Sequence, residues 1–93
     1  MRVRTSAPAA RDLRDIHDYI AADNPVAAER MYRRLRKAID MLGPFPRLGR
    51  ESVRRTSREL AVANTPYILI YRIIGEDVEV LRILHGAMRG EEE

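Results

Sequence analysis

Residues 58–87 read Arg-Glu-Leu-Ala-Val-Ala-Asn-Thr-Pro-Tyr-Ile-Leu-Ile-Tyr-Arg-Ile-Ile-Gly-Glu-Asp-Val-Glu-Val-Leu-Arg-Ile-Leu-His-Gly-Ala, and this stretch decides the fold. Runs rich in Ile, Val, Leu and Tyr are interrupted at Asn64-Thr65-Pro66 and at Gly75-Glu76. Such runs bounded by turn residues are typical of β-strands, and glycine at the first turn position suits a type II′ hairpin. The stretch therefore predicts three consecutive antiparallel strands.

A two-residue turn at 75–76 sets the register of the last two strands. The opposed pairs are then Ile74–Asp77, Ile73–Val78, Arg72–Glu79, Tyr71–Val80, Ile70–Leu81, Leu69–Arg82, Ile68–Ile83 and Tyr67–Leu84. Opposite charges meet at Arg72 and Glu79, which supports this register.

Alternation along these strands predicts two apolar faces. One face would carry Tyr67, Leu69, Tyr71, Ile73, Val78, Val80 and Leu84, and the other would carry Ile68, Ile70, Leu81 and Ile83. Because a short chain has only enough helix to cover one face, we expect a partner to cover the second face.

Capping residues predict the elements that precede this stretch. Residues 2–5 alternate and predict a short edge strand added to the three-stranded sheet. Pro8, just after Ser6, predicts the start of a helix that ends near Ala22. The apolar positions of this helix recur at i, i+3, i+4 and i+7, so one of its faces is expected to pack on the sheet.

A second helix is predicted from Asn24, as cap, and Pro25 to a stop at Gly43. The two helices are expected to form a hairpin on one face of a small antiparallel sheet, which gives an α+β fold of order β-α-α-β-β-β. Residues 44–57 predict a loop that Phe45 and Leu48 anchor, and residues 88–93 predict a frayed tail.

Composition narrows the functional classes. The chain has 93 residues, which predicts one domain over residues 1–93, and it has no cysteine, which excludes disulfides, thiolate nucleophiles and Cys-based zinc sites. No apolar run suits a signal peptide or a membrane span, so we expect a cytoplasmic protein without a membrane partner.

Positive charge is concentrated in one segment. The formal net charge is +3, and residues 47–58 hold five arginines against one glutamate, which is 5 − 1 = +4. Arginine favours bidentate contacts to carboxylate or phosphate, although a general compositional bias toward arginine explains the same excess. Aromatic side chains for base stacking are scarce, since the chain has one Phe and no Trp. We therefore expect any nucleic-acid binding to be weak or indirect.

The two histidines are the remaining candidates for chemistry. His17 lies on the inward stripe of the first helix, where a packed histidine is the common outcome. His85 ends the last strand on the predicted face of Ile68 and Ile83, as a strand cap or as a general acid or base. No third ligand stands at metal spacing, and no glycine-rich phosphate loop exists, so neither a metal nor another cofactor is predicted.

The chain resembles the RelE/ParE superfamily of type II toxin–antitoxin toxins, and within it the ParE branch. The resemblance covers nearly the whole chain and is carried by Asp12-Leu13 with Ile16 and Tyr19-Ile20, Asn24-Pro25 with Ala27-Ala28, Pro46 with Leu48-Gly49, Arg58-Glu59-Leu60, Thr65-Pro66-Tyr67 through Tyr71-Arg72-Ile73, and Val80 through Ala87.

This resemblance implies a toxin that inhibits DNA gyrase as a protein poison and that a cognate antitoxin neutralises. It also implies two sets of contact residues. The candidates for target binding are Arg54, Arg55, Arg58, His85 and Arg89, and those for antitoxin binding are Ile68, Ile70, Leu81 and Ile83. No catalytic residue is expected under this interpretation.

Two alternatives stay open at this point. Relatives similar to RelE cleave mRNA on the ribosome, and here a nuclease would use Arg72, Arg82 and His85. The chain departs from that group because Ile68 stands where the nucleases carry arginine, and no tyrosine follows His85. A scissile phosphate would thus lack a cation. The other alternative is a non-toxic module that binds the antitoxin and assists repression.

Overall fold

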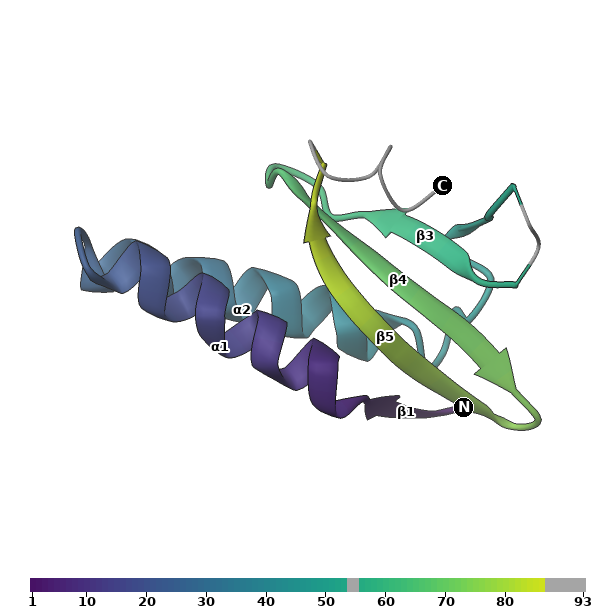
Figure 1. The fold of residues 1–93 in the computed structure, drawn as a ribbon. Helices are drawn as coiled ribbons and strands as arrows, with labels where there is room; N and C mark the ends of the chain where they lie inside the picture. Colours follow the sequence, from purple (N-terminus) through teal and green to yellow (C-terminus); the bar gives the residue numbers. More distant parts are fainter. Residues whose placement is uncertain (54–55, 87–93) are drawn as a thin grey trace.

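The computed structural model describes residues 1–53 and 56–86. Its elements are β1 (Arg2–Thr5), α1 (Ala7–Ala21), α2 (Pro25–Met41), β2 (Arg50–Glu51), β3 (Arg58–Ala61), β4 (Tyr67–Ile74) and β5 (Asp77–His85). The two helices run as a hairpin along one face of a twisted sheet (Figure 1). The α+β prediction with a helical hairpin on one sheet face is therefore confirmed.

Both helices begin at the predicted caps. The Ser6 side chain accepts a hydrogen bond from the amide of Ala9 at 3.1 Å, and Asn24 accepts one from Ala27 at 3.0 Å. These bonds satisfy amides that lack a partner in the first helical turn. No helix in residues 1–53 and 56–86 is long and apolar enough to cross a membrane.

The sheet is mixed, with strand order β1-β5-β4-β3-β2. The prediction of a wholly antiparallel sheet is wrong at β1, which pairs in parallel with residues 77–80 of β5. The reason is the path of the chain: the helical hairpin and the β2–β4 meander separate the two strands, and such a long connection permits parallel pairing. The two-residue strand β2, which pairs with Arg58 and Glu59, was not predicted.

The hairpin register is correct near the turn and wrong beyond it. Four predicted pairs, from Ile74–Asp77 to Tyr71–Val80, are present. Gly75 has φ of +58°, as a type II′ turn requires at its first position. After Tyr71 the pairing shifts by one residue, so the pairs are Ile70–Arg82, Leu69–Ile83, Ile68–Leu84 and Tyr67–His85. Leu81 is the extra residue of a β-bulge.

Ser6 stabilises this bulge from the neighbouring segment. Its amide donates to the carbonyl of Val80 and its hydroxyl to the carbonyl of Leu81, each at 2.9 Å. The residue that caps α1 thus also binds the irregular part of β5. Strand β1 ends and α1 begins at the point where β5 is bulged.

The bulge moves β5 side chains to the face opposite to the predicted one. Ile83, predicted on the second face, belongs to the core under the helices, whereas Leu84 pairs with Ile68 on the other side of the sheet. The core is formed by Ala9, Leu13, Leu35, Ile39, Leu42, Val62, Leu69, Tyr71, Val78, Val80 and Ile83.

Candidate functional site

His85 lies on the helix face of the sheet, at the end of β5. Its strand partner is Tyr67, and the two rings meet edge to face with centroids 5.7 Å apart at an angle of 82°. The prediction that His85 shares a face with Ile83 is confirmed, but the prediction that it shares one with Ile68 is wrong because of the bulge.

Tyr67, the strand partner of His85, has a shifted pKa. Burial is the main cause and the nearby Tyr19 the second, and both raise the pKa of Tyr67 above its ordinary value of 10.0. Its hydroxyl therefore stays protonated to higher pH than that of an exposed tyrosine. A pocket of about 180 Å³ adjoins it, between α1 and the end of β5, and Asp15, Arg82 and His85 contribute to its lining.

Arg72 lies on the other face of the sheet. Its Nε and Nη2 donate to Oε1 of Glu79 at 3.1 and 2.9 Å. This is the predicted cross-strand pair. The side chain of Arg72 is about half exposed, so the pair stabilises the hairpin only modestly.

Arg82 is bound by a carboxylate of the first helix. Its Nε donates to Oδ2 of Asp12 at 2.7 Å and its Nη2 donates to Oδ1 at 3.1 Å. The same Oδ2 accepts the backbone amide of Ile83 at 2.9 Å. Asp12 therefore binds the edge of β5 beyond the end of β1 and holds the guanidinium in a charge-assisted, two-pronged contact. Sequence reasoning did not find this network.

The three residues of the nuclease alternative are only partly brought together. Arg82 and His85 line the same pocket beside α1, because the Arg82 guanidinium reaches Asp12 at the edge of β5, whereas Arg72 lies on the sheet face opposite to His85. Both arginines already bind carboxylates. In the described residues, no group of three His, Asp or Glu side chains is arranged to hold a metal ion.

Arg58 is the described member of the arginine set proposed for target binding. Its Nη1 donates to the carbonyl of Gly49 at 2.7 Å and its Nη2 lies 3.4 Å from Glu51. Only 15% of its side chain is exposed. The other arginines of the set, Arg54, Arg55 and Arg89, lie outside the described residues.

The loop before β2 is held by Tyr71. The Tyr71 hydroxyl donates to the carbonyl of Pro46 at 2.8 Å and accepts the amide of Gly49 at 2.7 Å. A Cβ at Gly49 would lie 2.6 Å from the carbonyl oxygen of Glu59 and 2.8 Å from the Tyr71 ring, so only glycine fits there. The predicted anchors of this loop, Phe45 and Leu48, are both more than half exposed, and that prediction is wrong.

The residues predicted for antitoxin binding do not form one surface. Ile83 is buried in the core, and Ile68 is only 7% exposed. Ile70 and Leu81 are half-buried. The uncovered second face was expected from unbroken alternation, and the bulge removes Ile83 from that face.

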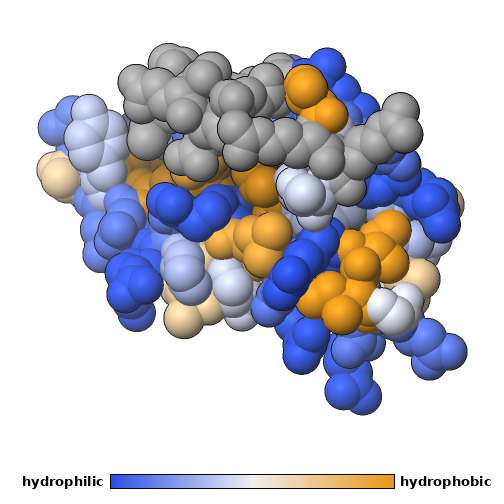
Figure 2. Space-filling view, turned by 45° about the vertical axis from the view of Figure 1, so that its right-hand side comes forward, coloured by the Kyte–Doolittle hydropathy of each residue, from blue (hydrophilic) through white to orange (hydrophobic). Residues whose placement is uncertain are grey.

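An apolar groove between α2 and β3 was missed by sequence reasoning. Its volume is about 390 Å³. Apolar side chains make up most of its lining, among them Met41, Leu48, Leu60 and Val62, and Lys37 also lines it. Strand β2 pairs with only the first two residues of β3, so the rest of β3 is a sheet edge within the described residues. Elsewhere, hydrophobic side chains also reach the surface between hydrophilic ones (Figure 2).

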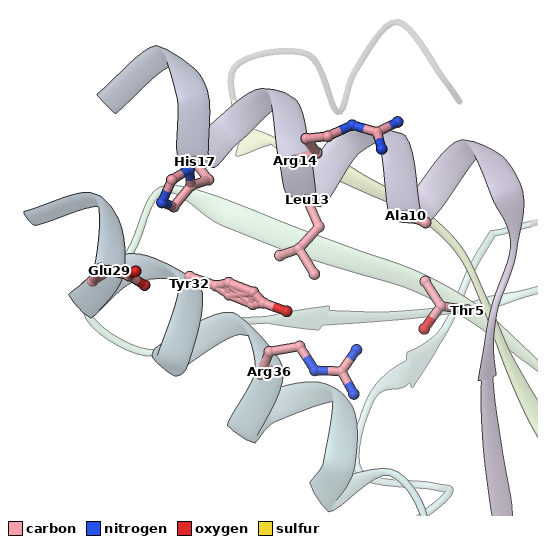
Figure 3. A pocket seen from close by; sticks show the side chains of 8 residues that line it. All are labelled: Thr5, Ala10, Leu13, Arg14, His17, Glu29, Tyr32 and Arg36. Carbon is pink, nitrogen blue, oxygen red and sulfur yellow. The ribbon is translucent and has the colours of Figure 1, made fainter. Parts of the chain in front are cut away.

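A second pocket, of about 450 Å³, lies between the two helices and β1. Figure 3 shows the Tyr32 ring below Leu13, with the guanidinium groups of Arg14 and Arg36 extending from opposite helices on the side of Thr5. His17 packs edge to face against Tyr32, with centroids 6.3 Å apart, as expected for an inward histidine. The mixed apolar and charged lining suits binding of a partner group.

Comparison with known proteins assigns the family. Residues 3–90 match the family model described as the ParE toxin of the type II toxin–antitoxin system, parDE. The chain belongs to the ParE toxin family. The predicted resemblance is thereby confirmed, and the members of this family are paired with an antitoxin.

Relatives of this ParE-family chain carry names from both branches. It is 42% identical to toxin RelE2 of Caulobacter vibrioides over 79 residues, which are 85% of this chain and 88% of that protein. It is 36% identical over 90 residues to toxin ParE3 of the same organism, covering 94% and 88%. The structure also matches a solved structure titled a chromosomal ParDE system from P. aeruginosa, with a TM-score of 0.84. The match covers 91% of this chain and 95% of that chain at 24% sequence identity, and it supports the fold.

Proposed function

We propose that this ParE-family toxin inhibits DNA gyrase by binding it as a protein poison, without chemistry of its own, and that a cognate antitoxin neutralises it. The observation that supports a poison over a nuclease is that the candidate cations already bind carboxylates. Arg72 lies on the sheet face opposite to His85 and binds Glu79, and Arg82, which lines a pocket with His85, is held by both carboxylate oxygens of Asp12.

Phosphodiester cleavage needs more than this arrangement offers. A general acid or base contributes roughly 10²–10⁴-fold, and the developing charge on the phosphate must also be stabilised by preorganised donors. Such donors must lie within hydrogen-bond distance of the same phosphate as the acid or base. Arg72, on the opposite sheet face, cannot meet that condition while His85 contacts the phosphate. Beside His85, the Asp12 carboxylate that binds Arg82 would repel a phosphate.

The decisive experiment compares two targets with antitoxin-free protein. The expected result is inhibition of gyrase supercoiling with accumulation of cleaved DNA, while ribosome-bound mRNA stays intact. His85→Ala should retain the inhibition, with at most a loss that follows from its packing on Tyr67. Codon-positioned mRNA cuts that disappear in His85→Ala would establish the nuclease alternative, and inertness toward both targets would favour a non-toxic module.

We also propose that the antitoxin covers the groove between α2 and β3. The groove is mainly apolar, with Arg34 and Lys37 at its rim, and it adjoins the unpaired part of β3. An amphipathic segment with acidic side chains complements such a surface, and a peptide can extend a free sheet edge. Apolar burial there would contribute about 25 cal/mol per Å².

The groove proposal is tested by placing a charge in it. Leu48→Asp puts a carboxylate on a groove residue that is 52% exposed, so the fold should tolerate it while antitoxin affinity falls at least tenfold. Val26→Asp is the matched control, because Val26 is 66% exposed and lies outside the groove. Equal affinities of both variants, measured by calorimetry, would refute this location.

A further inference from the structure

A polar pocket of about 240 Å³ joins the arginine-rich loop to the outer end of the β-meander. Arg47 comes from the loop, Arg58 from β3 and Arg72 from β4, and the hydroxyl residues Thr56 and Ser57 complete one side. Glu51 and Ile73 also line it. Three arginines from three separate segments thus line one small volume.

The arginines keep hydrogen-bond donors available to a ligand. A guanidinium carries five N–H donors. Arg58 uses Nη1 on Gly49 and Nη2 on Glu51, and Arg72 uses Nε and Nη2 on Glu79, so each keeps unused N–H groups. In the described part of the chain, Arg47 forms no ion pair or hydrogen bond.

We propose that this pocket binds a phosphate group of a DNA backbone. A planar carboxylate is satisfied by one guanidinium fork, whereas a phosphate presents oxygens in several directions and suits donors from separate segments. Hydroxyl groups, such as those of Thr56 and Ser57, are common additional phosphate donors at protein–DNA contacts. Glu51 already binds Arg58 and opposes any anion in the pocket, so the attraction for a phosphate depends mainly on Arg47, which has no carboxylate partner in the described residues.

The surrounding sequence supports a polyanion. Residues 47–58 carry five arginines and one glutamate, and Arg54 and Arg55 directly precede Thr56 in the sequence. Positive charge of this density attracts a polyanion over several ångströms beyond the contact itself. A single phosphate contact therefore forms within a generally favourable field.

This site adds a DNA contact to the proposed function, because gyrase acts on DNA. The biological role of the contact therefore rests on the proposed function. A poison that binds both gyrase and a DNA phosphate would hold the two together. The phosphate contact itself is measured without gyrase, so failure of the site and failure of the gyrase proposal are distinguishable.

The experiment measures binding of the full chain to a 20-base-pair duplex at several salt concentrations. Each phosphate contact contributes about 0.9 to the slope of log K against log salt. We expect Arg47→Gln to lower that slope by about 1 and to weaken binding about equally for unrelated sequences. Arg47→Lys should keep most of the slope, because a point charge still contacts phosphate.

Arg33→Gln is the matched control. It removes the same charge from an exposed residue of α2 outside the pocket, and it should leave the slope unchanged. Equal slopes for Arg47→Gln and wild type, or equal reductions in Arg47→Gln and Arg33→Gln, would overturn the proposal. A third outcome would also overturn it: Arg47→Gln binds the duplex normally but loses affinity for gyrase without DNA. That outcome would assign the pocket to a protein carboxylate.

Discussion

At the scale of single residues, two polar side chains hold the edge of β5 by binding its backbone. They are needed because β1 pairs with only part of β5. Ser6 donates to the carbonyls of Val80 and Leu81 at the bulge, and Asp12 accepts the amide of Ile83. A strand edge with unpaired amides would otherwise be open to other chains. Two short polar side chains of the β1–α1 segment replace a strand partner there.

Asp12→Ala should cost about 1–3 kcal/mol of unfolding free energy, because it leaves the Ile83 amide without its acceptor, whereas the Arg82 side chain is 43% exposed and stays hydrated. The loss is measurable as a lower denaturant midpoint. Asp15→Ala, on the same helix, is the control, because Asp15 is exposed and makes no ion pair or hydrogen bond in the described residues. A cost below 1 kcal/mol for Asp12→Ala would show that the contact is not formed in solution.

Tyr67 predicts an alkaline effect on stability. Its folded-state pKa is raised above 10.0, mainly by burial, so the neutral form stabilises the fold. That contribution is complete below the unfolded pKa near 10 and is lost as pH rises through the higher folded pKa. Tyr67→Phe should therefore lose less stability than wild type between about pH 9 and 11. Parallel denaturation curves for the two proteins across that range would contradict this assignment.

At the scale of elements, the β4–β5 hairpin offers a direct check of register through its charged pair. Arg72→Glu should destabilise the sheet by a few tenths to about 1 kcal/mol, because Glu79 would then face a like charge. Reversing Glu79 to Arg as well should recover part of the loss, which a double-mutant cycle measures. No recovery in the double variant would mean that the pair does not form.

The hairpin also shows how far sequence reasoning extends. The caps Ser6 and Asn24 and the turn at Gly75 were predictable, since each is a local interaction with its own residue signature. The bulge at Leu81 was not predicted, because β5 carries apolar residues that suit either face of the sheet, among them Val80, Ile83 and Leu84. The available signal was a conflict: an unbulged register places Arg82 opposite Leu69, in the core.

The candidate site was less predictable than the fold for the same reason. A shift of one residue changes the face of every following side chain, and His85 follows the bulge. The ion pair between Asp12 and Arg82 and the convergence of Arg47, Arg58 and Arg72 join distant segments. No local pattern encodes such contacts, so they required the three-dimensional arrangement.

At the scale of the whole molecule, the helices and the sheet leave different surfaces for different partners. The apolar groove lies between α2 and the β3 edge, whereas the arginine pocket lies where the loop meets β3 and β4. The two linings share no residue. Arg47→Gln should therefore lower the salt dependence of DNA binding while it leaves the affinity for the antitoxin unchanged.

The position of β5 inside the sheet governs when the molecule can fold during its own synthesis. β5 is made last, yet it lies between β1 and β4 and contributes core residues such as Val78 and Val80. A nascent chain that ends at Ile74 therefore lacks an interior strand and should be digested rapidly by protease, whereas a ribosome-bound chain with β5 extruded on a linker should resist. The fold would then form only after β5 has left the ribosome.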